Sequence, residues 1–171
     1  YAAGMAEVIK YAYIYDAKLH QTLVSGRADI ADIVRRCCEI KADYVKRDPY
    51  DTGIRMQLNY GHTLGHAIEA AAGYGAFLHG EAVAIGMVYA ARIGEKLGVS
   101  PAGLTEDTKS LLEQNRLPVE TEGNILHKAL ELLLADKKAE GRKINFILID
   151  EIGHAVIQKL DVEEIQKILK E

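Results

Sequence analysis

Asn59-Tyr-Gly-His-Thr-Leu-Gly-His-Ala-Ile-Glu69 is the most informative run of this 171-residue sequence. On a helix, His62 and His66 would share one face, with their Cβ atoms about 6 Å apart. This spacing suits one metal ion or one substrate, and it equally suits two histidines on an exposed face. Gly61 and Gly65 each cost a helix about 1 kcal/mol relative to Ala. Two glycines beside two histidines favour a helix whose backbone is closely approached by another group.

The flanking sequence has apolar residues at the three- and four-residue spacing of amphipathic helices. Helices are expected over residues 5–24, 30–47, 56–72, 80–98, 104–115, 124–135 and 162–169. Residues 48–53 are expected to form a turn because Asp48-Pro49 disfavours helix. The β-branched stretches 143–149 and 155–157, joined by a turn with Gly153, predict a hairpin. The predicted fold class is mainly α, with one small β-hairpin near the C-terminus.

Composition places the chain among ordinary globular proteins and excludes several functions. Hydrophobic residues make up 49% and charged residues 27%, so residues 1–171 are expected to form one folded domain. The net charge of -4 argues against a nucleic-acid partner. No apolar run approaches the roughly 20 residues that span a bilayer, so we expect no membrane association and a cytoplasmic location. Cys37 and Cys38 are neighbours and are expected to be buried, reduced thiols.

The chain starts at Tyr1, within a helix-like segment and without an initiator methionine. We therefore expect it to be a piece of a longer protein.

Glu7, His62 and His79 together would supply one carboxylate and two imidazoles, the donor set of a catalytic zinc site with open positions. Their spacing cannot bring them together, and each has a simpler interpretation. Glu7 and Lys10 could form a helix-face ion pair, and His79 could cap a helix. Further cationic side chains would suit an anionic substrate such as a phosphorylated acid, or else a solvated surface: Lys10, Lys41, Arg55, Lys137 and Lys138.

Five stretches give the chain a specific resemblance to a known family. They are Gly4-Met-Ala-Glu-Val-Ile-Lys10, Cys38-Glu-Ile-Lys41, Asp51-Thr-Gly-Ile-Arg55, Leu58-Asn-Tyr-Gly-His-Thr-Leu-Gly-His-Ala-Ile-Glu69 and Leu78-His-Gly-Glu-Ala-Val-Ala-Ile-Gly-Met87. In order and spacing they resemble the 3-dehydroquinate synthases. The resemblance covers almost the whole chain from Gly4 onward, and it is to the C-terminal, mainly helical half of those enzymes.

The resemblance implies a role for each candidate residue. The metal ligands would be Glu7, His62 and His79, holding Zn²⁺ or Co²⁺. The catalytic residues would be His66, Lys10 and Lys41, which places His66 in the pocket and not on the metal. Substrate would be bound by Arg55, Asn59, Lys138 and Asp51. Members of the family usually carry Glu where this chain has the shorter Asp51.

The resemblance also implies a reaction and partners. Such enzymes convert 3-deoxy-D-arabino-heptulosonate 7-phosphate, a phosphorylated sugar acid, to 3-dehydroquinate and phosphate in the shikimate pathway of aromatic amino acid biosynthesis. They use NAD transiently and form homodimers. NAD would bind an N-terminal domain, and nothing in this sequence resembles that domain. We therefore expect no cofactor-binding residue in this chain and no activity from it alone.

Three other functions remain open at this point. Another sugar-phosphate cyclase, such as a 2-deoxy-scyllo-inosose or valiolone-type synthase, would share the metal and NAD. Arg55 with Asn59 indicates a substrate that bears a carboxylate, which the substrates of those enzymes lack. The others are a metal-dependent polyol dehydrogenase of related fold and a metal-free helical assembly module. Without its partner domain the chain is expected to expose an apolar patch near its start and to self-associate as a homo-oligomer. The patch would be formed by Met5, Ala6, Val8, Ile9 and Tyr13.

Overall fold

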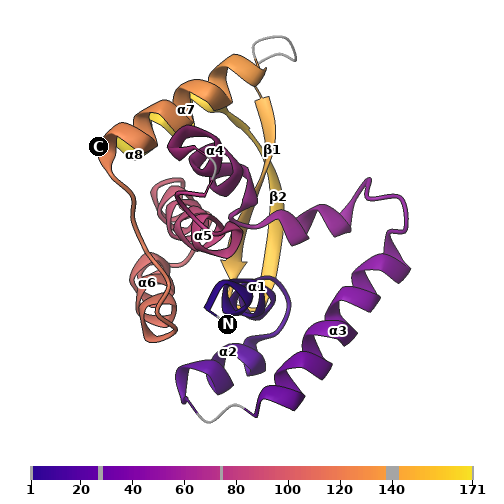
Figure 1. Ribbon diagram of the computed structural model, residues 1–171. Helices are drawn as coiled ribbons and strands as arrows, with labels where there is room; N and C mark the ends of the chain where they lie inside the picture. The colour runs from indigo at the N-terminus through magenta and orange to yellow at the C-terminus, as the bar shows by residue number, and fades with distance from the viewer. Residues whose placement is uncertain (1, 27–28, 74, 138–142, 171) are drawn as a thin grey trace.

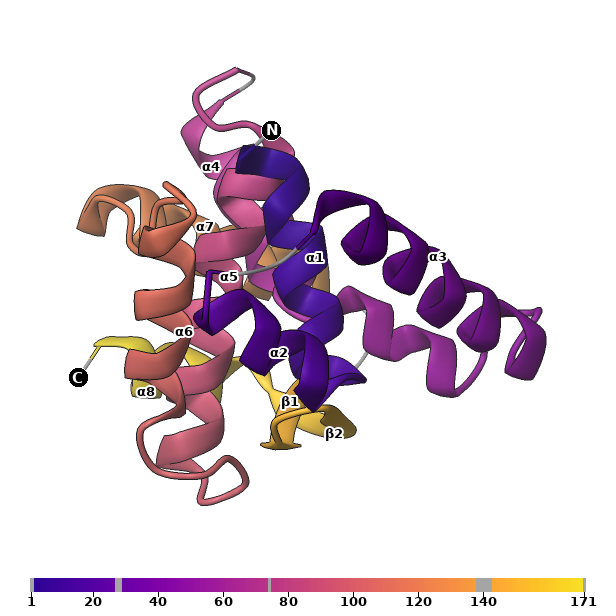
Figure 2. The ribbon, with the colours of Figure 1, turned by 90° about the horizontal axis from the view of Figure 1, so that it is seen from below.

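The computed structural model describes residues 2–26, 29–73, 75–137 and 143–170 (Figures 1 and 2). Its elements, in chain order, are α1 (Ala2–Ile14), α2 (Ala17–Val24), α3 (Ile30–Arg47), the 3₁₀ helix η1 (Ile54–Asn59), α4 (His62–Ala72), α5 (His79–Lys96), α6 (Leu104–Gln114), α7 (Gly123–Lys137), β1 (Lys143–Glu151), β2 (His154–Asp161) and α8 (Val162–Lys170). The predicted mainly helical class with one C-terminal hairpin is confirmed.

Helix α5 runs through the middle of the molecule, with α1, α4, α6 and the hairpin packed around it (Figure 1). Every residue from Ala82 to Ala91 is buried. This ten-residue stretch is apolar on all sides, and such a helix has to be surrounded. The sequence of α5 therefore places it in the core.

Two glycines allow α4 and α5 to approach each other closely. A Cβ atom at Gly86 would overlap the carbonyl oxygen of Gly61. Gly61 itself has a φ of 77°, in the left-handed region that favours glycine. The sequence predicted a close approach to the backbone here, and the approaching group is helix α5.

Two of the expected helices are interrupted in the structure. The helix expected over 5–24 is two helices, because Asp16 caps α2 by accepting hydrogen bonds from the backbone N–H groups of Lys18 and Leu19, both at 3.1 Å. The helix expected over 56–72 is the 3₁₀ helix η1 followed by α4. The left-handed conformation of Gly61 separates them.

Asp16 also binds Arg36 of α3, whose Nε lies 2.5 Å from its Oδ2. Burial alone would raise the pKa of Asp16, but hydrogen bonds from Arg36 and the Leu19 N–H outweigh burial and lower this pKa. A depressed pKa in the folded state stabilises the protein above about pH 4, and this stabilisation is lost as the pH falls through the folded-state pKa.

We therefore expect Asp16→Asn to lower the free energy of unfolding by about 1–2 kcal/mol at neutral pH. The difference from the unchanged protein should be smaller at about pH 3 than at neutral pH, because the stabilisation from a carboxylate with a lowered pKa decreases below about pH 4. Urea unfolding of both proteins at the two pH values measures this. A difference that is independent of pH would contradict the assigned role of the Asp16 carboxylate.

The hairpin is longer than expected and is fastened to α1. Strands β1 and β2 pair antiparallel, with Ile147 opposite Ile157. In the turn, Gly153 has a φ of 93°, and its N–H donates to the carbonyl oxygen of Tyr13 at 2.8 Å. Strand β1 thereby lies against both α1 and α5, which brings its side chains close to the elements that carry the histidines.

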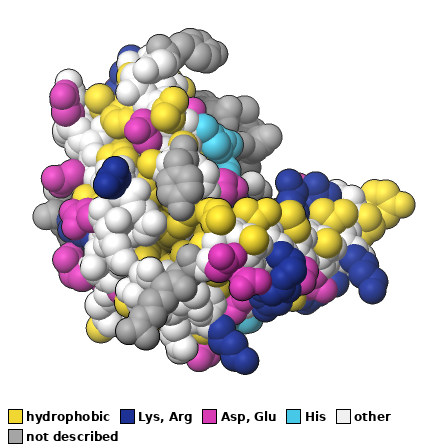
Figure 3. All heavy atoms as spheres, turned by 60° about the horizontal axis from the view of Figure 1, so that its bottom comes forward, with side chains coloured by type: hydrophobic (Ala, Val, Ile, Leu, Met, Phe, Trp, Pro, Cys, Tyr) yellow, Lys and Arg dark blue, Asp and Glu magenta, His cyan; other side chains and the backbone are white. Residues whose placement is uncertain are grey.

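The apolar patch expected near the start of the chain is not exposed. Met5, Ala6, Ile9 and Tyr13 are buried and Val8 is partly buried, because α1 packs against α5. Several exposed apolar side chains lie instead along and beside α3, the arm that projects from the body in Figure 3; they include Ile30, Val34, Val45 and Tyr50.

The expected burial of both cysteines is also only half right. Cys37 is partly buried, whereas Cys38 is exposed. The two residues are neighbours on one helix, so only the first can turn towards the body of the protein. No helix within the described part of the chain combines the length and the apolar character needed to cross a membrane.

Candidate metal centre

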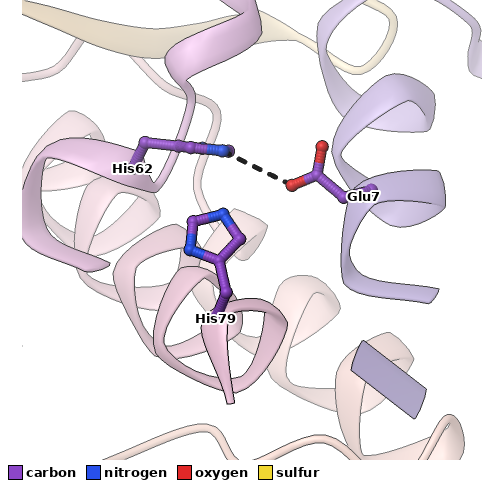
Figure 4. Close-up of side chains that lie close together, drawn as sticks. All are labelled: Glu7, His62 and His79. Carbon is purple, nitrogen blue, oxygen red and sulfur yellow. Dashed lines mark ion pairs between the residues drawn. The ribbon is translucent and has the colours of Figure 1, made fainter. Parts of the chain in front are cut away.

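Three elements distant in sequence bring one carboxylate and two imidazoles together (Figure 4). Glu7 lies in the middle of α1, while His62 and His79 are the first residues of α4 and α5. One ligand atom from each of the three side chains lies within 4.8 Å of the other two. The structure thus assembles the donor set that sequence spacing alone left scattered.

The starts of α1 and α5 are held in contact, which fixes Glu7 relative to His79. A Cβ atom at Gly80 would overlap the backbone carbonyl of Ala3, so only glycine permits this approach. The first turn of α5 is closed by Glu81, whose Oε2 accepts a hydrogen bond from the Leu78 N–H at 2.8 Å. Backbone packing, and not only side-chain contact, therefore sets the geometry of the centre.

Glu7 has one carboxylate oxygen left unsatisfied. Its Oε1 is buried and makes no hydrogen bond within the described residues, although it lies 3.4 Å from Nε2 of His62. A buried carboxylate oxygen without a partner is costly. A divalent cation between Glu7, His62 and His79 would satisfy it, so the residues present fit such an ion.

His62 is held in the form that binds metals. Its Nδ1 lies 3.1 Å from the carbonyl oxygen of Tyr60, which leaves Nε2 directed at Glu7. Burial, followed by the charge of Lys10, lowers the pKa of His62. The imidazole is therefore favoured in its neutral, ligating state.

Lys10 forms the expected ion pair with Glu7, but the pair is not on a solvated face. Nζ of Lys10 lies 2.6 Å from Oε2 of Glu7, and Lys10 is only 3% exposed. Burial lowers the pKa of Lys10, Glu7 opposes this shift, and the nearby charge of Lys41 adds to it. The centre thus contains an ammonium group fixed next to the candidate ligand.

His66 lies beside the three candidate ligands. Its ring centroid is 5.6 Å from that of His62 and 5.5 Å from that of His79. The two α4 histidines share a face, as their spacing predicted. His66 belongs to a second grouping, in which its ligand atom lies within 4.8 Å of those of Glu69 and His79.

A cavity of about 330 Å³ adjoins these histidines and is large enough for a small substrate. Asn59, His62 and His66 line it from one side, and Asn145 and Ile147 of strand β1 line it from another. Asn59 thus lies where a substrate-binding residue is expected.

The other expected substrate-binding residues, and Lys41, are not among the described residues that line this cavity. Asp51 is exposed in the turn after α3 with a φ of 56°. Nη1 of Arg55 lies 3.4 Å from the carbonyl oxygen of Pro49, so this side chain folds back on its own loop. Lys41 is exposed on α3, and Lys138 lies outside the described residues.

Sequence reasoning missed polar contacts elsewhere in the structure. The Asp48 carboxylate accepts backbone hydrogen bonds from Thr52, Gly53 and Arg55, which shapes the loop before η1. His20 is buried with Nε2 2.8 Å from Oδ2 of Asp107. Its partner is far away in sequence, so no local pattern could have revealed this contact.

The chain matches the family model described as 3-dehydroquinate synthase C-terminal over residues 4–139. It is 42% identical to the 3-dehydroquinate synthase of Streptococcus gordonii, over 98% of this chain and 49% of the relative. It is 41% identical to that of Streptococcus sanguinis, with coverage of 98% and 49%. The chain therefore spans about half the length of these relatives.

Solved structures show the same fold. A 2-epi-5-epi-valiolone synthase from Streptomyces hygroscopicus subsp. jinggangensis 5008, with NAD⁺ and Zn²⁺ bound, has a TM-score of 0.79 and 23% identity. A 2-deoxy-scyllo-inosose synthase complexed with carbaglucose-6-phosphate, NAD⁺ and Co²⁺ has a TM-score of 0.75 and 22% identity. This chain covers 50% of each, and each match covers 99% of this chain. On the family match and the two streptococcal relatives, the chain belongs to the 3-dehydroquinate synthase family, in which it corresponds to the C-terminal domain.

Proposed function

We propose that this chain supplies the metal- and substrate-binding half of a 3-dehydroquinate synthase. The whole enzyme would convert 3-deoxy-D-arabino-heptulosonate 7-phosphate to 3-dehydroquinate and phosphate. The observation that carries the proposal is the convergence of Glu7, His62 and His79 within 4.8 Å, in a chain whose relatives bear this enzyme's name.

Glu7, His62 and His79 would hold a divalent cation, with zinc and cobalt as the candidates. Two neighbours of the same fold contain Zn²⁺ and Co²⁺, respectively. A cation bound there would supply Lewis acidity to substrate oxygens. The buried Oε1 of Glu7, which accepts no hydrogen bond among the described residues, supports this assignment because a cation would satisfy that oxygen.

The chain's own side chains would bind substrate and move protons around that centre. Lys10 is fixed and buried, so its ammonium can pair with an anionic substrate group without first being ordered. His66 lines the cavity and has a neutral form that can accept a proton from a substrate hydroxyl. Asn59 would donate a hydrogen bond from its side-chain amide. The cationic groups proposed to bind the substrate's carboxylate and phosphate are Lys41, Arg55 and Lys138. Asp51 is proposed to accept a hydrogen bond from a substrate hydroxyl.

The transient oxidation would need a second half of the enzyme that binds NAD. We propose that this half precedes the present chain in the complete protein and that the complete protein forms a homodimer. Valiolone- and inosose-type synthases are the alternative, since proteins with those names share the fold. The 42% identity to a 3-dehydroquinate synthase favours a substrate that bears a carboxylate.

The chain by itself is expected to release no phosphate from the heptulosonate phosphate and to bind no NAD, because NAD is proposed to bind the other half of the enzyme. The full-length parent enzyme should release phosphate from this substrate and not from a sugar phosphate that lacks the carboxylate. Calorimetry with NAD and a phosphate-release assay measure the two halves of this prediction. Micromolar affinity of this chain for NAD would contradict it, and preference of the parent for the sugar phosphate without a carboxylate would support the alternative cyclases.

A further inference from the structure

One carboxylate beside the candidate metal centre is not accounted for by the ligand set. Glu69 lies on α4 at seven residues from His62 and three from His66, so the three side chains form one stripe along that helix. The Oε2 atom of Glu69 lies 3.1 Å from Nδ1 of His79, the first residue of α5. The carboxylate thus spans from one histidine-bearing helix to the other.

This contact determines which nitrogen of His79 is available to a cation. A neutral imidazole carries one N–H and one lone pair, and a carboxylate can only accept a hydrogen bond. The proton must therefore lie on Nδ1, and the lone pair lies on Nε2. Figure 4 shows that the ring nitrogen remote from the His79 backbone points towards the contact between His62 and Glu7.

His62 is oriented in the same way by a different acceptor. Its Nδ1 lies 3.1 Å from the Tyr60 carbonyl oxygen, and its Nε2 faces Glu7 at 3.4 Å. Both imidazoles therefore have an oxygen acceptor at Nδ1 and present Nε2 to the same space. Outer partners of this kind fix the tautomer and ring orientation of metal-binding histidines.

We infer that Glu69 is a positioning residue of the metal centre, which holds His79 with Nε2 towards the cation. The inference rests on the proposed metal-binding function of Glu7, His62 and His79. The competing interpretation is a second cation held by His66, Glu69 and His79, whose ligand atoms also lie within 4.8 Å of one another. A cation at Nδ1 of His79 would displace the proton that Glu69 accepts, so the two interpretations are mutually exclusive.

Three variants of this chain separate these possibilities. Glu69→Ala removes the acceptor, and Glu69→Gln keeps an oxygen that can still accept from Nδ1. Glu131→Ala is the matched control, because Glu131 lies 3.4 Å from His127 in an exposed pair on α7. Thermal unfolding of all three checks that the fold is retained.

Cation binding is measured by titration with Co²⁺, followed by visible absorption. Glu69→Ala should weaken Co²⁺ binding by about 10- to 100-fold with one Co²⁺ per chain before and after the change, since loss of such outer partners has effects of this size. Glu69→Gln should retain most of the affinity, and Glu131→Ala should bind like the unchanged chain. Equal affinity of Glu69→Ala and the unchanged chain would overturn the inference. If the unchanged chain binds two Co²⁺ and Glu69→Ala binds one, the inference is also overturned and the second site is established.

A second measurement needs no metal. The ¹⁵N chemical shifts of the His79 ring, recorded at about pH 9 where ordinary imidazoles are neutral, report the tautomer. The metal-free chain should show the proton on Nδ1, and Glu69→Ala should show a mixture. A proton on Nε2 in the unchanged chain would overturn the inference. If the tautomer is as expected but Co²⁺ does not bind, then the proposed metal function fails while the contact between Glu69 and His79 stands.

Discussion

His62→Ala and His79→Ala should each weaken Co²⁺ binding to this chain by about 100- to 1000-fold, whereas His66→Ala should leave it nearly unchanged. The size follows from the apparent free energy of structural zinc sites, about 10–16 kcal/mol shared among roughly four ligands. The contrast follows from position, because His62 and His79 form a group with Glu7 that does not include His66. Titration with Co²⁺ and metal analysis of the purified variants measure both effects.

The same substitutions in the full-length parent enzyme distinguish metal ligands from residues that only line the pocket. His62→Ala and His79→Ala should abolish metal-dependent turnover, while His66→Ala should slow turnover with the metal still bound. Equal loss of metal from all three variants would instead mean that His62 and His66 bind the ion as a pair. That outcome would contradict the assignment of His66 to the pocket and not to the metal.

Gly86→Ala is expected to have the largest effect on folding, lowering the free energy of unfolding by more than about 3 kcal/mol or preventing folding altogether. The new Cβ atom would overlap the carbonyl oxygen of Gly61, and both partners are backbone positions in the buried contact of α4 with α5. Overpacking of a well-packed core commonly costs about 1–3 kcal/mol, and here no flexible side chain can move aside.

Gly4→Ala is a control for which the free energy of unfolding is expected to rise. Gly4 lies within α1, and a Cβ atom there would meet nothing within 4 Å. Alanine should therefore stabilise the helix by about 0.5–1 kcal/mol. Urea unfolding of both variants measures the difference. A Gly86→Ala protein within about 1 kcal/mol of the unchanged chain would mean that α4 and α5 are not packed as described.

Helical periodicity predicted where helices exist but not where they break. Residues 30–47 are α3 with the expected bounds, because the amphipathic pattern and the Asp48-Pro49 stop agree. The breaks at Asp16 and Gly61 were missed. Asp16 ends a continuous apolar pattern by capping α2, and Gly61 does so by a left-handed backbone that depends on contact with α5. The first cause is a local polar contact and the second is a tertiary contact. The periodicity of apolar residues carries no information about either.

The candidate site was predictable to different depths. Spacing indicated that His62 and His66 share a face, which is a property of one helix. Only the family resemblance grouped Glu7 with His62 and His79, since they come from three helices. Neither spacing nor the resemblance predicted the contact of Glu69 with His79, because this contact depends on how α4 packs against α5.

The expected exposure of the apolar start of α1 was wrong for a related reason. An amphipathic pattern states which residues are apolar, but not which neighbour covers them. In the structure α1 packs against α5 and the hairpin, and Ile9 and Tyr13 are buried, whereas several exposed apolar side chains lie around α3. Surface predictions from sequence fail where the partner element is distant in the chain.

Anomalous X-ray diffraction from crystals of this chain grown with Co²⁺ tests the central claim most directly. We predict one strong peak at the cobalt edge, bounded by Oε1 of Glu7, Nε2 of His62 and Nε2 of His79. A peak displaced to the group formed by His66, Glu69 and His79, or crystals without a peak at either position, would contradict the account.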